Sequence, residues 1–318
     1  MTKAIIDKII SGQKRAVSRA ISLIEDGLPV AYELIRELHE HTGKAYRIGI
    51  TGPPGAGKST ITNQLTKRFV DENLKVGIIA VDPTSPFSGG ALLGDRVRMT
   101  DVGILPGVFI RSMATRGSLG GLSKKAIDAA DVLDAAGYDI IIFETVGVGQ
   151  SELDIAKTAD TTMVVLVPES GDAVQAMKAG LMEIADFFVL NKADRPGSES
   201  AYMALKTILS IKFRESGAWV PPIVKSIAQE NNGIEDIKDE VSKHRDYLKS
   251  GNRLHIKREE NFRTRIKVIV EDDLRNEIWN SHREDKLNNS LKSVVLGDVS
   301  PYTLSNEIIE NYKKSFNL

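Results

Sequence analysis

Residues 47–60 read RIGITGPPGAGKST, and this stretch decides the fold. Alternating apolar residues lead into a glycine-rich turn that ends in Gly57-Lys58-Ser59, which fits the pattern G-x-x-x-x-G-K-[ST]. In this pattern the glycines let backbone N–H groups turn inward around phosphate oxygens, and the N-terminus of the following helix adds positive charge. The stretch therefore predicts a phosphate-binding loop between a strand and a helix.

The side chains of this loop have distinct expected tasks. Lys58 should reach the β and γ phosphates, which makes it a catalytic candidate, and the Ser59 hydroxyl should bind Mg²⁺. The candidate nucleotide-binding residues of the loop are Gly52, Gly55, Ala56, Gly57, Lys58, Ser59 and Thr60.

Apolar, strand-like runs alternate with helical stretches over residues 45–250. The expected strands cover residues 46–51, 76–82, 107–111, 139–144, 161–168, 187–191 and 222–226. Several of them are apolar throughout, as parallel strands covered on both faces are. We predict an α/β fold, a P-loop NTPase domain with a mainly parallel, doubly wound sheet whose ligand lies at the carboxyl ends of the strands.

Helical patterns flank this predicted domain on both sides. Residues 1–44 carry apolar residues at helical spacing with glycine interruptions, which predicts an N-terminal helical extension. In residues 251–318 an apolar stripe at helical spacing indicates a long helix, and Ser300-Pro301 is typical of the start of another. The stripe consists of Phe262, Ile266, Ile269 or Val270, Leu274 and Ile278. Such a stripe serves either packing within the chain or association of two chains, and the residues leave both open. We predict a C-terminal helical arm, which on the second alternative is a dimerisation arm in a homodimer.

The sequence Asn191-Lys192-Ala193-Asp194, which follows an apolar strand, predicts which nucleotide base the chain binds. The Asp194 carboxylate can accept two hydrogen bonds from guanine, from N1–H and from the exocyclic amine. Adenine lacks this donor pair and would leave the carboxylate unsatisfied, so the site should select GTP and GDP. Ser226, Ile227 and Ala228, after the next strand, are expected to brace the base.

A carboxylate at the end of another core strand is the main candidate beside the γ phosphate. Glu144 begins the sequence ETVGVGQ, so it is a candidate for both the Mg²⁺ shell and catalysis, and Gly147 is a candidate γ-phosphate sensor. Asp82 and Asp95 are further metal candidates, and the sequence does not rank them. No glutamine directly follows Gly147, the place where Ras-like proteins keep their water-positioning residue, so we expect slow intrinsic turnover.

The bulk composition excludes several classes of function. The chain has 318 residues, a formal net charge of −1 and no cysteine. Such a balance gives no electrostatic reason to expect nucleic acid or a membrane as a partner, and disulfides, thiolate zinc sites and cysteine catalysis are excluded. No signal-like or membrane-spanning apolar run stands out, so we expect a cytoplasmic protein.

Five motifs together resemble one family. They are GPPGAGKST, AVDPTSPFSGGALLGDRVRM, MATRG, FETVGVGQSE and LNKAD, and the similarity runs from about residue 14 into the C-terminal arm. The chain is similar to the methylmalonyl-CoA mutase-associated GTPases, which have also been regarded as arginine/ornithine transport kinases.

The resemblance implies a function that the residues alone do not. Members of the family are homodimeric GTPase chaperones of adenosylcobalamin-dependent acyl-CoA mutases, which they help to load with cofactor and protect from inactivation. By similarity, the segment ESGDAVQAMK at residues 169–178 is an additional switch loop, with Asp172, Gln175 and Lys178 as switch residues.

Two other functions are open to a phosphate-binding chain of this kind. A small-molecule kinase would usually carry an adenine site, and the sequence NKAD argues against it. A GTPase metallochaperone would need a Cys/His cluster, whereas only His39 and His41 lie close together and, on a helix, would point apart.

Overall fold

The computed structural model describes residues 2–82, 100–114, 124–145, 151–169, 180–212 and 219–315. These residues form two compact units, Met1–Lys257 and Arg258–Leu318. The described part of the first unit contains the phosphate loop at residues 52–59 and the base loop at residues 191–194.

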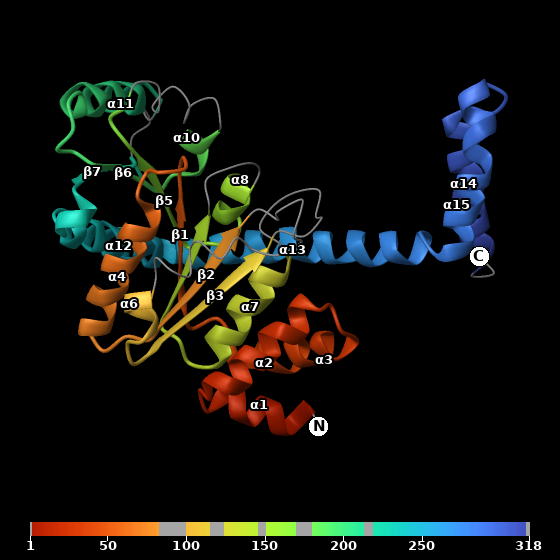
Figure 1. Ribbon diagram of the computed structural model, residues 1–318, viewed down its shortest axis with the longest axis horizontal. Helices are drawn as coiled ribbons and strands as arrows, with labels where there is room; N and C mark the ends of the chain where they lie inside the picture. The colour runs from red at the N-terminus through yellow and green to blue at the C-terminus, as the bar shows by residue number, and fades with distance from the viewer. Residues whose placement is uncertain are drawn as a thin grey trace. The chain divides into compact units, whose positions relative to one another are not determined.

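The first unit is built on a seven-stranded parallel sheet in the order β3-β2-β4-β1-β5-β6-β7 (Figure 1). Its strands are β1 Tyr46–Thr51, β2 Val76–Asp82, β3 Val108–Ala114, β4 Ile140–Thr145, β5 Thr161–Leu166, β6 Phe187–Asn191 and β7 Ile223–Ser226. All seven predicted strands are confirmed to within a few residues. Because the order reverses at β1, its carboxyl end is the switch point where such folds bind ligands.

Helices cover both faces of this sheet (Figure 1). They are α1 Thr2–Ile10, α2 Lys14–Glu25, α3 Pro29–Leu38, α4 Lys58–Asp71, α6 Thr100–Gly103, α7 Lys124–Ala135, α8 Ser151–Ala156, α10 Leu181–Ile184, α11 Ser198–Lys212 and α12 Ile234–Lys249, with short 3-10 turns at His39–His41, Ala228–Glu230 and Ser250–Asn252. One core joins α4, α6 and α12 to the sheet, and another joins α1, α2, α3, α7 and α8 to the opposite face. A third core packs α10 and α11 against β5 and β6.

The predicted N-terminal helical extension packs on α7 and the β3 edge. Ile9, Val17, Ile21 and Leu34 are fully buried or nearly so within that core. Lys14 donates to the Val108 carbonyl at 2.8 Å, which adds a polar contact at the same surface. The three helices therefore pack as part of the first unit.

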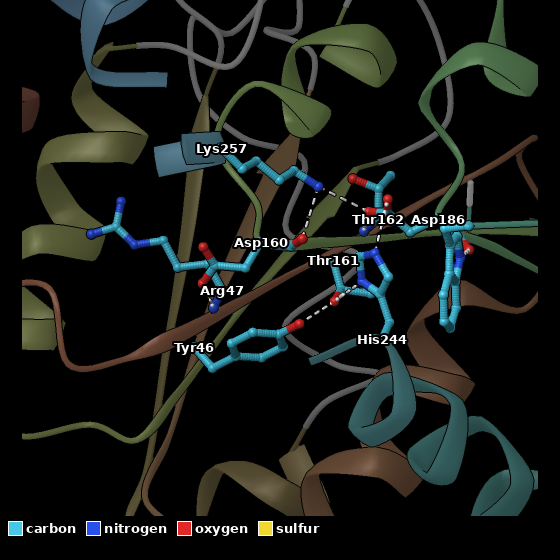
Figure 2. Close-up of polar contacts among 9 residues, drawn as sticks. Tyr46, Arg47, Asp160, Thr161, Thr162, Asp186, His244 and Lys257 are labelled. Atoms are coloured by element: carbon cyan, nitrogen blue, oxygen red, sulfur yellow. Dashed lines mark hydrogen bonds and ion pairs between the residues drawn. The ribbon is translucent and has the colours of Figure 1, made fainter. Parts of the chain in front are cut away.

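A buried polar network lies at the amino ends of β1, β5 and β6, the edge opposite the strand ends that carry the motifs. Figure 2 shows Tyr46 bonded to the Thr161 hydroxyl, which lies 2.8 Å from His244 Nδ1. His244 Nε2 lies 3.3 Å from Asp186 Oδ1, and Lys257 Nζ donates to Asp186 Oδ2 at 3.1 Å. The network fastens α12 and the first residues of α13 to the sheet.

The second unit is helical. Its helices are α13 Arg253–Ile278, which begins in the first unit, α14 Ser281–Leu296 and α15 Pro301–Lys314. Ser300 caps α15 by accepting a hydrogen bond from the Thr303 N–H, with Pro301 at the first helical position, as the sequence predicts. Arg283, which is buried, donates to the final carbonyls of α13 at Glu277 and Ile278. None of the helices in the described ranges is long and apolar enough to cross a membrane.

Candidate functional site

The phosphate loop begins where β1 ends, and its first glycine is sterically required. Gly52 has a φ of 134°, and a Cβ atom there would lie 2.0 Å from the Val165 carbonyl oxygen of β5. Gly57 has a φ of 93°, and its Cβ would lie 2.3 Å from the Asn191 side-chain nitrogen. Only glycine fits at either position, which is why the loop can lie directly against two neighbouring strands.

Lys58 and Ser59 open helix α4 where this loop ends. The Lys58 side chain is buried, and its ammonium donates to the carbonyls of Gly52 at 2.7 Å and Pro53 at 2.9 Å. These bonds hold the positive charge over the loop that should receive the phosphates. The Ser59 hydroxyl donates to Glu144 Oε1 at 2.5 Å.

Glu144 reaches this hydroxyl from β4, the strand beside β1. The two strands pair with Ile50 opposite Glu144, so the carboxylate emerges level with the start of the phosphate loop. Glu144 is only 4% exposed. A buried carboxylate and a hydroxyl oxygen in contact are the ligand chemistry that Mg²⁺ prefers, so this pair fits the ion.

The third predicted metal residue with described backbone is Asp82. It ends β2, which pairs with β4 so that Val81 lies opposite Thr145. The backbone of Asp82 therefore reaches the same sheet edge as Glu144. Asp95 and the switch candidates Gly147, Asp172, Gln175 and Lys178 lie outside the described residues.

The base loop follows β6, and Asn191 joins it to the phosphate loop. The Asn191 side chain is buried; its Nδ2 donates to the Ala56 carbonyl at 2.8 Å. Its Oδ1 accepts from the Ser226 hydroxyl and from the Ala228 N–H, each at 3.1 Å. One amide thus connects all three predicted nucleotide-binding segments.

Lys192 and Asp194 complete the base loop. Lys192 has a φ of 57°, and its ammonium donates to the Gly55 carbonyl at 2.7 Å, giving a second connection between the loops. The Ala193 N–H donates to the Ser226 carbonyl at 3.0 Å, which sets the loop beside β7. Asp194 is exposed, so its carboxylate is accessible to a base.

Two residues beneath the site were not predicted from the sequence. The hydroxyls of Thr51 and Thr145 lie 3.1 Å apart, and both side chains are buried at the ends of β1 and β4. Each directly adjoins a motif, Gly52 in one case and Glu144 in the other. The only signal in the sequence is a polar residue at the end of each apolar strand.

A phosphate loop, a carboxylate on the adjacent strand and an N-K-x-D base loop at one sheet edge define the GTPase branch of the P-loop NTPases. Comparison with known proteins agrees with this class. A family model described as methylmalonyl Co-A mutase-associated GTPase MeaB matches residues 17–283. The chain therefore belongs to this family, and it is an enzyme that binds guanine nucleotide and hydrolyses GTP.

Individual relatives are similar over most of the chain. A putative GTPase of Pyrococcus abyssi is 48% identical over 313 residues, which cover 98% of this chain and 96% of the relative. The mitochondrial methylmalonic aciduria type A homolog of Mus musculus is 30% identical over 283 residues, 84% of this chain and 68% of the relative. A solved structure described as a LAO/AO transport system kinase superposes with a TM-score of 0.74 at 27% identity, covering 98% of this chain and 97% of that one.

Proposed function

We propose that this GTPase is a chaperone of an adenosylcobalamin-dependent acyl-CoA mutase, with methylmalonyl-CoA mutase as the client. In this role the GTP state gates loading of the cobalamin cofactor and protects the mutase from inactivation. The observation that carries the proposal is the match of residues 17–283 to a family described as mutase-associated. A relative described as a methylmalonic aciduria type A homolog supports the same client.

The geometry supports particular roles for the residues of the site. We assign the phosphates to the loop residues with Lys58 as the main charge, guanine to Asp194, and the bracing of the base to Ser226, Ile227 and Ala228. Ser59 and Glu144 would hold Mg²⁺, with Asp82 and Asp95 as further candidates, and the bound ion would neutralise phosphate charge during hydrolysis. Glu144, in contact with Ser59 at 2.5 Å, is also the candidate catalytic carboxylate.

The second unit would serve as a dimerisation arm. Helix α13 exposes Ile266, Val270 and Leu274 with fractions of 59%, 51% and 45%, and their spacing puts them on one face. A homodimer that covers this face would remove an apolar stripe from water. The domains we propose are therefore an N-terminal helical extension, residues 1–44, a GTPase domain, residues 45–250, and the arm, residues 251–318.

The test is GTP hydrolysis by the purified protein with and without an adenosylcobalamin-dependent methylmalonyl-CoA mutase. We expect slow turnover that rises when the mutase is added, with ATP as the control substrate. A Lys58→Ala variant should not hydrolyse GTP with or without the mutase. Any phosphate that it still releases therefore does not come from this site. If GTP turnover does not change when the mutase is added, the assignment as a GTPase stands and the mutase is rejected as its client.

A further inference from the structure

We propose that Thr51 and Thr145 are a pair of positioning residues for GTP hydrolysis. Their hydrogen-bonded hydroxyls hold the strand end that carries Glu144 at a fixed offset from the start of the phosphate loop. The proposal rests on the proposed role of Glu144 beside Ser59.

The geometry places the pair between the two halves of the site. Thr145 Oγ1 donates to Thr51 Oγ1 at 3.1 Å, and the side chains are 1% and 0% exposed. Thr51 immediately precedes Gly52, and Thr145 immediately follows Glu144. The bond therefore connects the last residue of β1 to the last residue of β4.

Side-chain alternation separates the pair from the metal face. Successive residues of a strand point to opposite faces, so Thr145 points away from the face where Glu144 contacts Ser59. Phe143, on the same face as Thr145, packs with α7 and α8. The pair thus lies on the opposite face of the sheet from the contact between Glu144 and Ser59, and it holds the backbone beneath Glu144.

The residue types at these positions need an explanation. Five of the ten residues that precede the two threonines in β1 and β4 are isoleucine, and valine has the shape of threonine without the hydroxyl. Buried hydroxyls add nothing over methyl groups for packing, because their desolvation must first be offset by a hydrogen bond. A directional bond does fix the distance between two strand ends, which packing alone sets less tightly.

The decisive variant is the double replacement Thr51→Val with Thr145→Val, which removes both hydroxyls and leaves neither unpaired. We expect an unfolding midpoint no lower than wild type and a GDP affinity within about two-fold, because shape is kept and no partner is orphaned. We expect kcat for GTP without mutase to fall about ten-fold, within the range that a sub-ångström misplacement of a catalytic group produces. The Mg²⁺ concentration needed for half-maximal rate should rise.

Two further variants separate positioning from general damage. Thr145→Ser keeps the hydroxyl and should keep kcat within about two-fold of wild type. Thr162→Val is the matched control, because the Thr162 hydroxyl is also buried in the sheet but has no hydrogen-bond partner among the described residues. It should leave kcat unchanged.

The proposal is overturned if the double variant hydrolyses GTP at the wild-type rate, or if Thr145→Ser is as slow as the double variant. It is also overturned if kcat and GDP affinity fall in parallel, which would indicate a merely structural role. A separate Glu144→Gln variant with wild-type kcat would reject the role of Glu144 itself, and a mutase without effect on turnover would reject only the client.

Discussion

The Asn191 side-chain amide donates to the Ala56 carbonyl at 2.8 Å, across 135 positions of sequence. The residue that opens the base loop is therefore bonded to the phosphate loop. Since Asn191 Oδ1 also accepts from Ser226 and Ala228, the phosphate loop, the base loop and the bracing loop share one buried group. Nucleotide affinity should depend on it even without direct contact to the ligand.

We predict that Asn191→Ala lowers affinity for GDP and GTP alike. The change removes one donor and one acceptor and leaves the Ala56 carbonyl and the Ala228 N–H without this partner. We expect this to reduce the free energy of nucleotide binding by about 1–3 kcal/mol. That range corresponds to roughly five- to 150-fold in Kd. Titration with a fluorescent GDP analogue measures it. Asn289→Ala, at an exposed position of α14, is the control, and an unchanged Kd for Asn191→Ala would contradict the prediction.

Asp194→Asn should change the choice of base without changing the fold. The exposed carboxylate is placed to accept from two guanine donors, whereas an amide can accept only one of these bonds and brings a donor of its own. We expect GTP affinity to fall roughly a hundred-fold, which matches the upper part of the cost of an unsatisfied hydrogen-bonding group. Competition of GTP, GDP and ATP for the site measures the change. Discrimination against ATP equal to that of the wild type would exclude Asp194 as the base-selecting residue.

Gly52 offers a steric prediction with a matched control. Gly52→Ala would place a Cβ atom 2.0 Å from the Val165 carbonyl oxygen at a φ of 134°, so β1 and β5 must separate or the loop must move. We expect a lower unfolding midpoint and loss of GDP binding. Gly137→Ala has a similar backbone requirement, a φ of 77°, but its Cβ would meet nothing within 4 Å. It should lower stability by only about 1 kcal/mol and leave binding intact. Equal effects of the two variants would show that strain, and not the Val165 contact, matters.

The sequence predicts the sheet and its ligand loops well because both depend on local patterns. Apolar runs give the seven strands, and Thr51, Glu144 and Asn191 lie at one edge because the carboxyl ends of β1, β4 and β6 share it. The side-chain contacts between strands could not be predicted in this way. The sequence does not show that Thr51 faces Thr145, because such pairs depend on strand order and register.

The polar network around His244 could not be predicted from the sequence for the same reason. Tyr46, Thr161, Asp186, His244 and Lys257 come from five separate places in the chain (Figure 2). Each is an unremarkable polar residue in its own segment. His244 is only 2% exposed, and both of its ring nitrogens are in contact with other residues of the network.

This network predicts how stability depends on pH. Burial lowers the pKa of His244 below its ordinary value of 6.5; the nearby Lys257 acts in the same direction, and the Asp186 and Asp160 charges oppose it. The unfolded chain therefore binds the proton more readily than the folded one. Stability should be fully present above about pH 6.5 and fall as the pH drops through the lowered pKa.

The measurement compares unfolding midpoints between neutral and mildly acidic pH. We expect wild type to lose more stability on acidification than His244→Gln, so that the two curves converge as the pH falls. His255→Gln, at an exposed position of α13, should run parallel to wild type. A His244→Gln curve that also stays parallel to wild type would show that proton uptake at this site does not affect folding.

The arm gives a prediction about assembly that leaves the nucleotide site untouched. On α13 the residues Ile266 and Val270 lie four positions apart on one face, whereas Val268, 43% exposed, lies about 200° around the helix from Ile266. If the apolar stripe is the dimer contact, Ile266→Glu with Val270→Glu buries charge in the interface and should convert the dimer to monomers. Val268→Glu adds charge to the same helix away from the stripe and should leave the dimer intact.

Light scattering coupled to size-exclusion chromatography measures the mass directly, and GDP binding should be equal in all variants. A doubly substituted protein that remains dimeric would place the contact elsewhere, and wild type that is monomeric at working concentration would reject the arm as a stable dimerisation element.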